Sequence, residues 1–229
     1  MIGTIANTIA IVVGSLIGGF AANGLKEKYR TILFTAMGLA AVGIGINAVV
    51  QNMPSSTYPV LFIVSLALGS AFGTLLDLDG RFNNLVNKHS KEGSQLARGL
   101  STAIMVFCIG TLSILGPINS ALYGDETFLF TNATLDFVTS MVLASTFGVG
   151  IAAAAPVLFL WQGGIFLLAQ FLSPMLSGGL MCEVSIVGGF LIFASGLSIL
   201  NLKEIPTMNM LPALFVPAIW FPIASLIGM

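Results

Sequence analysis

Long apolar stretches, separated by short polar ones, run along the whole chain. A helix that crosses a membrane needs about 20 predominantly apolar residues, and these stretches have that length. The pattern predicts an all-α fold, a polytopic transmembrane helical bundle that forms a single integral membrane domain over residues 1–229. We expect about eight spans, at residues 2–22, 31–51, 58–77, 97–117, 134–155, 157–177, 183–202 and 210–228.

The apolar stretch from 134 to 177 is too long for a single crossing. It contains a run of alanines that ends at Pro156. Because proline disfavours the helical conformation of the residue before it, we place a break at residues 152–156, between the fifth and sixth spans.

Composition indicates that lipid, not water, surrounds most of the surface. Of the 229 residues, 56% are hydrophobic and only 7% are charged, against roughly 25% charged in a soluble domain. The net charge of −1 excludes a basic surface for nucleic acid. The lipid bilayer is therefore the first predicted partner.

The basic residues test the number of spans, because cytoplasmic loops carry an excess of lysine and arginine. With eight spans they all lie on one face, and Asp125 and Glu126 lie on the other. The basic loops would be cytoplasmic and both termini outside, whereas seven spans would place Lys203 outside. The basic residues are Lys26, Lys28, Arg30, Arg81, Lys88, Lys91, Arg98 and Lys203.

Two pairs of segments resemble each other. Residues 38–47 resemble 189–198, and residues 59–63 resemble 212–216. The second and third spans would then pair with the seventh and eighth as an inverted repeat, which is typical of secondary transporters. The alternative is chance, since glycine, proline and leucine recur in any apolar helix.

Two GxxxG motifs favour close helix packing, one with Gly14 and Gly18 and one with Gly69 and Gly73. They fit either packing within one chain or a homodimer interface.

Polar side chains inside spans are costly unless they have partners or face water. Asp136 falls near the predicted outer start of the fifth span, with Thr139 and Ser140 one turn later. This group can bind sodium, a proton or a cationic solute. The alternative is an interfacial aspartate stabilised by the helix dipole, and the same interpretation applies to Glu183.

Gln162 is followed by Gly163 and Gly164, which fit either a locally unwound helix that binds a ligand or plain helix packing. The complete set of candidate binding residues is Asn7, Asn119, Asp136, Thr139, Ser140, Gln162 and Asn209.

The sequence lacks the groupings of histidine, cysteine and carboxylate residues that enzymes usually use for catalysis. His89 is the single histidine, and Cys108 and Cys182 fall in or beside apolar segments without a metal-binding pattern. No phosphate-binding GxxxxGK[ST] sequence occurs. We expect no enzyme activity, no cofactor and no metal site.

Several motifs, in this order, resemble the YqgA/YdfK-like family of bacterial inner-membrane proteins. They are residues 3–7 with Gly14, 107–110 leading to 114–116, 135–140, Gln162 with Gly163, and 209–213. The resemblance implies a multi-pass protein of the bacterial cytoplasmic (inner) membrane. It also implies a largely uncharacterised family described at most as candidate transporters.

The polar positions shared within that family map to Asn7, Asn119, Asp136, Gln162 and Asn209 in this chain. Its members often have a lysine shortly before the Leu-Asp pair, whereas this chain has Thr-Asn-Ala-Thr at 131–134. A salt bridge to Asp136 from that direction is therefore not available.

The leading hypothesis is a secondary transporter or ion-coupled carrier for a small solute, working by alternating access. Asp136 would bind a coupling cation or proton, and the neighbouring polar residues would bind the solute or ion. The alternatives are an oligomeric ion channel, which needs a continuous polar path, and a structural or regulatory membrane protein without a ligand.

Overall fold

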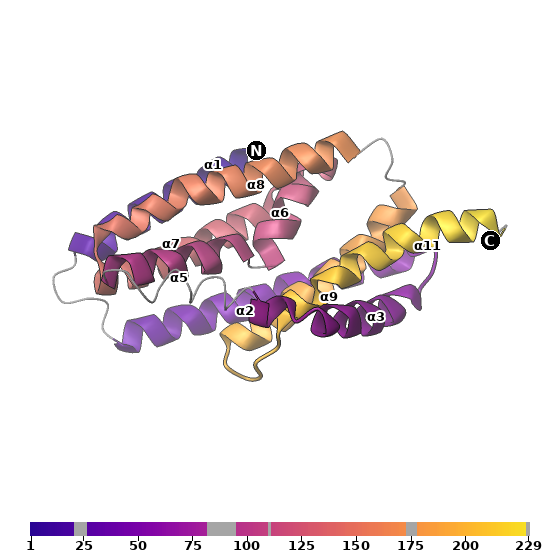
Figure 1. The fold of residues 1–229 in the computed structure, drawn as a ribbon, viewed down its shortest axis with the longest axis horizontal. Coiled ribbons are helices and arrows are strands. Elements are labelled where there is room, and N and C mark those ends of the chain that lie inside the picture. The colour runs from indigo at the N-terminus through magenta and orange to yellow at the C-terminus, as the bar shows by residue number, and fades with distance from the viewer. Residues whose placement is uncertain (21–26, 82–94, 110, 173–177, 228–229) are drawn as a thin grey trace. The chain divides into compact units, whose positions relative to one another are not determined.

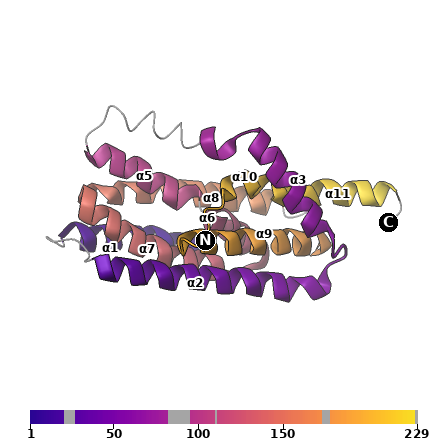
Figure 2. The ribbon, with the colours of Figure 1, turned by 90° about the horizontal axis from the view of Figure 1, so that it is seen from below.

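The computed structural model describes residues 1–20, 27–81, 95–109, 111–172 and 178–227, and within these ranges the regular elements are all helices (Figures 1 and 2). The all-α prediction is therefore confirmed for the described part of the chain. His89, Lys26, Lys88 and Lys91 lie outside it. The chain forms two compact units: unit 1 comprises residues 1–37 and 83–173, and unit 2 comprises residues 38–82 and 174–229.

Six of the described helical segments are long and apolar enough to cross a membrane. Two further predicted spans correspond to less regular segments. Helix α3 (Leu61–Leu75) is apolar but shorter, and helices α5 (Gln95–Ile109) and α6 (Thr111–Tyr123) meet at a bend of 41°. The six segments are Ile2–Phe20, Thr31–Ser55, Thr127–Phe147, Val149–Phe171, Gly178–Ile199 and Thr207–Leu226.

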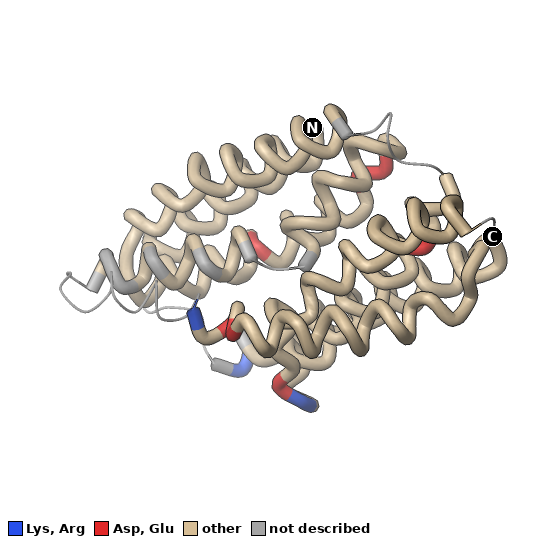
Figure 3. The backbone as a smooth tube through the Cα atoms, turned by 45° about the vertical axis from the view of Figure 1, so that its right-hand side comes forward, with Lys and Arg blue, Asp and Glu red and all other residues tan. Residues whose placement is uncertain are grey.

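The surface of these helices suits a lipid environment. Leu75, Leu160 and Phe171 are each more than 70% exposed, and many other large apolar side chains are exposed with them. Acidic and basic residues are sparse along the described backbone (Figure 3). An exposed apolar surface of this extent indicates burial in a membrane, because soluble proteins rarely expose one.

Unit 1 contains α1 (Ile2–Phe20), α5, α6, α7 (Thr127–Phe147), the 3-10 helix η2 (Val149–Ala153) and α8 (Ala154–Leu172). Helices α1 and α7 run in the same direction, because Gly3 packs against Leu129 and Gly18 against Met141. The backbones touch where α1 has glycine: a Cβ on Gly18 would overlap the carbonyl oxygen of Met141. The first GxxxG motif therefore packs within the chain.

The break between α7 and α8 lies at Gly148, not at the predicted residues 152–156. Gly148 has a φ of +94°, a conformation that favours glycine. Helix α8 begins at Ala154, so Pro156 lies in its first turn, where the missing N–H has no helical acceptor to lose. The fifth span therefore occupies 127–147 instead of 134–155.

Unit 2 contains residues 38–52 of α2 (Glu27–Asn52), η1 (Met53–Ser55), α3, α9 (Gly178–Ile199), α10 (Thr207–Met210), η4 (Leu211–Leu214) and α11 (Phe215–Leu226). Most of α9 is buried, and α3, α10 and α11 pack against it. The second GxxxG motif also packs inside the chain, because Gly69 lies against Ala213 and Gly73 against Asn209.

Helices α2 and α9 cross through reciprocal glycine contacts. A Cβ on Gly38 would lie 3.2 Å from the carbonyl oxygen of Gly196, and one on Gly196 would lie 3.0 Å from that of Gly38. The corresponding distances between Gly45 and Gly189 are 2.7 and 2.9 Å. The two helices are therefore antiparallel, and each glycine packs against the glycine at the opposite end of the other segment.

Candidate functional site: a buried carboxyl between two helices

Asp136 is the centre of the polar core of unit 1. It is 3% exposed, and its Oδ2 accepts hydrogen bonds from Asn7 Nδ2 at 2.9 Å and from Asn132 Nδ2 at 3.0 Å. Asn7 is fully buried on α1. The parallel packing of α1 on α7, with Gly3 and Gly14 in contact with α7, brings Asn7 level with the carboxyl.

The position of Asp136 corrects the interfacial interpretation. Helix α7 begins at Thr127, whose N–H donates to Asp125 Oδ1 at 2.9 Å, so Asp136 lies in the middle of the helix. A mid-helix aspartate is too far from the N-terminus for the helix dipole to stabilise it strongly, since that effect fades within the first turn. The unfavourable free energy of burying this carboxyl group must therefore be offset by hydrogen bonds or ions close to it.

Four buried oxygens in unit 1 have no hydrogen-bond partner within the described chain: Thr4 Oγ1, Asn7 Oδ1, Ser15 Oγ and Gln162 Oε1. Thr4 and Asn7 are three residues apart and share a face of α1. Asn7 donates its amide N–H to Asp136, which leaves its carbonyl oxygen beside the carboxyl as an acceptor. Buried acceptors without donors are uncommon in native structures and are places where a cation or water can bind.

Gln162 lies in the middle of α8 and donates from Nε2 to Ser113 Oγ on α6 at 3.0 Å. Pro117, four residues after Ser113, has no N–H, so the carbonyl of Ser113 loses its usual helical donor. Helix α8 continues through Gly163 and Gly164, so of the two alternatives for this segment the locally unwound helix is not the one observed.

The other predicted residues do not join this group. Ser140 is buried, but its hydroxyl donates to the carbonyl of Phe137 at 2.9 Å. Thr139 and Asn119 are half-buried and make no hydrogen bond to Asp136 among the described residues. Asn209 belongs to unit 2, where its Oδ1 accepts the N–H of Asp79 at 2.8 Å. The structure therefore brings together only Asn7 and Asp136 from the predicted set.

Asn132 is a site residue that the sequence pattern missed. It lies four residues before Asp136, a spacing that places both side chains on one helix face. The predicted span began at 134 and excluded it, so the correct helix start would have revealed it. Asn132 lies in the segment where the family resemblance led us to look for a lysine, and it supplies a neutral donor there instead.

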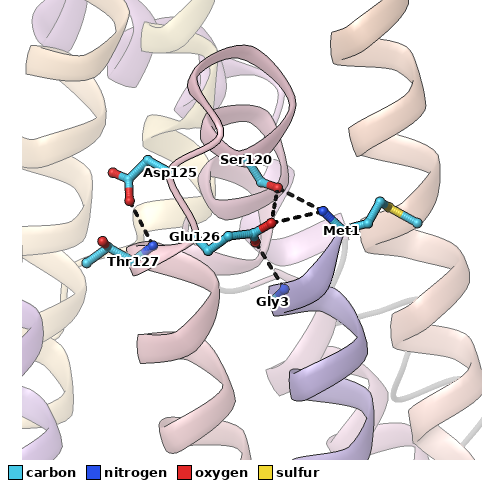
Figure 4. A network of polar contacts seen from close by, with 6 residues as sticks. All are labelled: Met1, Gly3, Ser120, Asp125, Glu126 and Thr127. Carbon is cyan, nitrogen blue, oxygen red and sulfur yellow. Dashed lines mark hydrogen bonds and ion pairs between the residues drawn. The ribbon is translucent and has the colours of Figure 1, made fainter.

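A second polar cluster surrounds Glu126, at the start of α7 (Figure 4). Its Oε1 accepts from the Met1 ammonium at 3.0 Å and from Ser120 Oγ at 2.9 Å, and its Oε2 accepts from the Gly3 N–H at 3.0 Å. Burial alone would raise the pKa of Glu126, but these hydrogen bonds and the positive charge of the ammonium outweigh it and lower the pKa. The cluster ties the start of α1 to the connection between α6 and α7.

Unit 2 holds its own buried carboxyl, Glu183 of α9, which the sequence pattern had favoured as interfacial. It is only 1% exposed. Its Oε1 accepts hydrogen bonds from Ser56 Oγ at 2.7 Å and from the Tyr58 N–H at 2.9 Å. Both cysteines are buried and free, and Cys182, the neighbour of Glu183, donates from Sγ to the carbonyl of Asn52 at 3.1 Å. Glu183 therefore lies near the start of α9, as predicted, but its side chain is buried within unit 2.

Known proteins resemble this chain over almost its whole length. Residues 2–222 match the family described as "Protein of unknown function (DUF554)". The "Uncharacterized membrane protein YdfK" of Bacillus subtilis (strain 168) is 57% identical over 219 residues, which cover 96% of this chain and 95% of that protein. The "Uncharacterized protein YqgA" of Escherichia coli (strain K12) is 30% identical over 227 residues, covering 94% of each chain. No solved structure matches. The resemblance drawn from the sequence motifs is therefore confirmed.

Proposed function

The chain belongs to the DUF554 family, whose function is unknown, and from the buried carboxyl of unit 1 we propose that it is a secondary transporter. In this proposal the protein is an ion-coupled carrier for a small solute, and Asp136 binds the coupling cation. The observation that carries the proposal is the pairing of Asp136 with Asn7 in the interior of a membrane protein.

The surroundings of Asp136 suit a cation. Its two hydrogen-bond donors are neutral amides, and no described lysine, arginine or histidine side chain pairs with it. Ionisable side chains inside membrane spans are rare and usually serve ion or proton pathways. A cation at the carboxylate would also neutralise its charge, and the free Oδ1 of Asn7 supplies an oxygen next to it.

Two contacts within unit 2 support eight crossings. Ser56, before α3, bonds Glu183 near the start of α9, whereas Asp79, after α3, bonds Asn209, which follows α9. The starts of α3 and α9 therefore lie on one side of unit 2 and their ends on the other. The part of the chain between the end of α3 and the start of α9 must therefore cross the membrane an odd number of times. This favours α5 and α6 as one bent span, followed by α7 and α8.

The glycine contacts of unit 2 support the inverted repeat. The segments that resemble each other in sequence, 38–45 and 189–196, pack antiparallel on one another. The contact of Gly38 with Gly196 has its counterpart in that of Gly189 with Gly45, as a two-fold relation between the segments requires. Alternating access in secondary transporters uses repeats of this kind.

The test is ion-dependent binding and transport by the purified full-length chain. Sodium, potassium, lithium, pH and a panel of small metabolites would be screened for their effect on the melting temperature, because a ligand of the folded state raises it. We expect a cation-dependent rise that Asp136→Asn reduces and that Asp125→Asn, at an exposed aspartate, retains in full. In liposomes the same cation gradient should drive solute uptake by the wild type and by Asp125→Asn, but not by Asp136→Asn.

A cation response that is unchanged in Asp136→Asn, or no response to any ion, would overturn this function. The channel alternative relied on association through the GxxxG motifs, and both motifs pack within the chain. A channel would still be recognised by stepwise conductance in planar bilayers.

A further inference from the structure

Glu183 has an uneven set of partners. Both of its hydrogen bonds, from Ser56 and from the Tyr58 N–H, reach Oε1. Its Oε2 is buried and has no partner in the described part of the chain. An ionised carboxylate with one bare oxygen in a low-dielectric interior is strongly unfavourable, so this oxygen needs a ligand.

Within unit 2, the described elements around Glu183 supply no positive charge that could pair with this oxygen. Helices α3, α10 and α11 and the 3-10 helices η1 and η4 pack on α9, and none of them contains a titratable residue. The same holds for the part of α2 that contacts α9, residues 38–52. The titratable groups near Glu183 are Cys182, its neighbour in sequence, and Tyr58.

The described basic residues of unit 2 lie far away. Lys203 follows the opposite end of α9, and the 16 residues from Glu183 to Ile199 alone span about 24 Å. Arg81 lies beyond the far end of α3, whose 15 residues span about 22 Å from the Tyr58 side. Neither cation can therefore pair with Glu183 in this fold.

A cavity of about 390 Å³ with a mostly apolar lining lies next to Tyr58, and Glu183 is not one of its lining residues. The cavity is lined by Thr57, Tyr58 and Trp220 among others, and the backbone N–H of Tyr58 bonds Glu183.

We propose that Glu183 binds a monovalent cation, either a proton or an alkali-metal ion, at Oε2, and that this is a second cation site in unit 2. Oε1 is then the oxygen that accepts from Ser56 and Tyr58, and the cation occupies the oxygen that lacks a partner. The site is independent of Asp136, which lies in unit 1 on a different helix.

The test uses the purified full-length protein and compares the wild type with Glu183→Gln and Asp136→Asn. Sodium and potassium titrations of the melting temperature detect a metal ion, and the carboxylic C=O band in infrared spectra at neutral pH detects a proton. We expect Glu183→Gln to remove one component of one of these two signals, and Asp136→Asn to keep that component. The titration then identifies an alkali-metal ion, and the band a proton.

If Glu183→Gln shows the same titration and the same carboxyl band as the wild type, the proposal is overturned. If that variant does not fold, Ser56→Ala replaces it, because this variant keeps the carboxyl and removes one donor to Oε1. We then expect a shift in the cation midpoint or in the C=O frequency, and no change in either overturns the proposal. A failure at Glu183 leaves the Asp136 signal in place, so it is distinct from a failure of the transport function.

Discussion

The side-chain amide of Asn7 lies 2.9 Å from the carboxyl of Asp136, although 129 residues separate them in sequence. The bond joins α1 to α7 at a level where both side chains are buried. This hydrogen bond holds the two helices together. It also orients the Asp136 carboxyl group in the proposed cation site. These two roles can be separated by experiment, because one concerns stability and the other the response to ions.

Asn7→Ala should destabilise the protein by about 1–3 kcal/mol, because it leaves a buried carboxyl with one donor fewer. The measurement is thermal or denaturant unfolding in detergent. Combined with Asp136→Ala in a double-mutant cycle, it should give a non-additive effect, since the two side chains are in contact. Thr8→Ala is the control, because the Thr8 hydroxyl donates only to the carbonyl of Thr4 in its own helix. Additive effects of the two substitutions would show that the bond contributes nothing.

Gly18→Ala should destabilise unit 1 strongly, by about 1–3 kcal/mol, because the added methyl group would overlap the backbone of Met141 and force α1 away from α7. Gly164→Ala is the matched control, since a Cβ there meets nothing within 4 Å. It should be neutral or slightly stabilising, as expected for glycine replaced by alanine in a helix. Melting temperatures of the two variants check this directly, and equal losses would contradict the observed packing.

The sequence predicted the helices and the importance of Asp136 because hydrophobic length and buried charge are local signals. The prediction of the site was incomplete where it depends on the exact start of a helix and on contacts between segments far apart in sequence. Asn132 was missed because the predicted span began at Thr134, after Thr131 and Asn132. In the structure the helix starts earlier, and the Thr131 and Asn132 side chains donate to the carbonyl of Thr127 and to Asp136. Asn209 falls in unit 2 and Asp136 in unit 1, and single-sequence reasoning does not show which unit a residue joins.

The proposed eight-span topology predicts which positions a membrane-impermeant thiol reagent can reach. In a background without Cys108 and Cys182, cysteine at Thr57 or Asp125 should react in intact cells, and cysteine at Lys28 or Lys203 only after permeabilisation. All four positions are exposed and lie at or near helix ends. Reaction of position 203 in intact cells would favour seven crossings and contradict the contacts of unit 2.

The lowered pKa of Glu126 predicts that the folded protein loses stability in acid. Its pKa is lowered in the folded protein from the ordinary value of 4.5, because hydrogen bonds and the ammonium group favour the ionised form more than burial disfavours it. A group with a lowered pKa contributes stability that is fully present above its unfolded value, and that is lost as the pH falls through its folded value. The loss should therefore occur below pH 4.5.

The measurement is the melting temperature of the wild type and of Glu126→Gln from about pH 7 to about pH 3. At neutral pH the variant should be less stable by about 1 kcal/mol, a modest effect because the carboxylate is partly solvated. Below pH 4.5 the two curves should converge, since the wild-type carboxylate is then protonated and resembles the amide. Asp125→Asn is the control: it removes an exposed carboxylate that accepts the Thr127 N–H, without touching the Glu126 cluster. Parallel curves for the wild type and Glu126→Gln would show that the charge of Glu126 does not stabilise the start of α1 against α7.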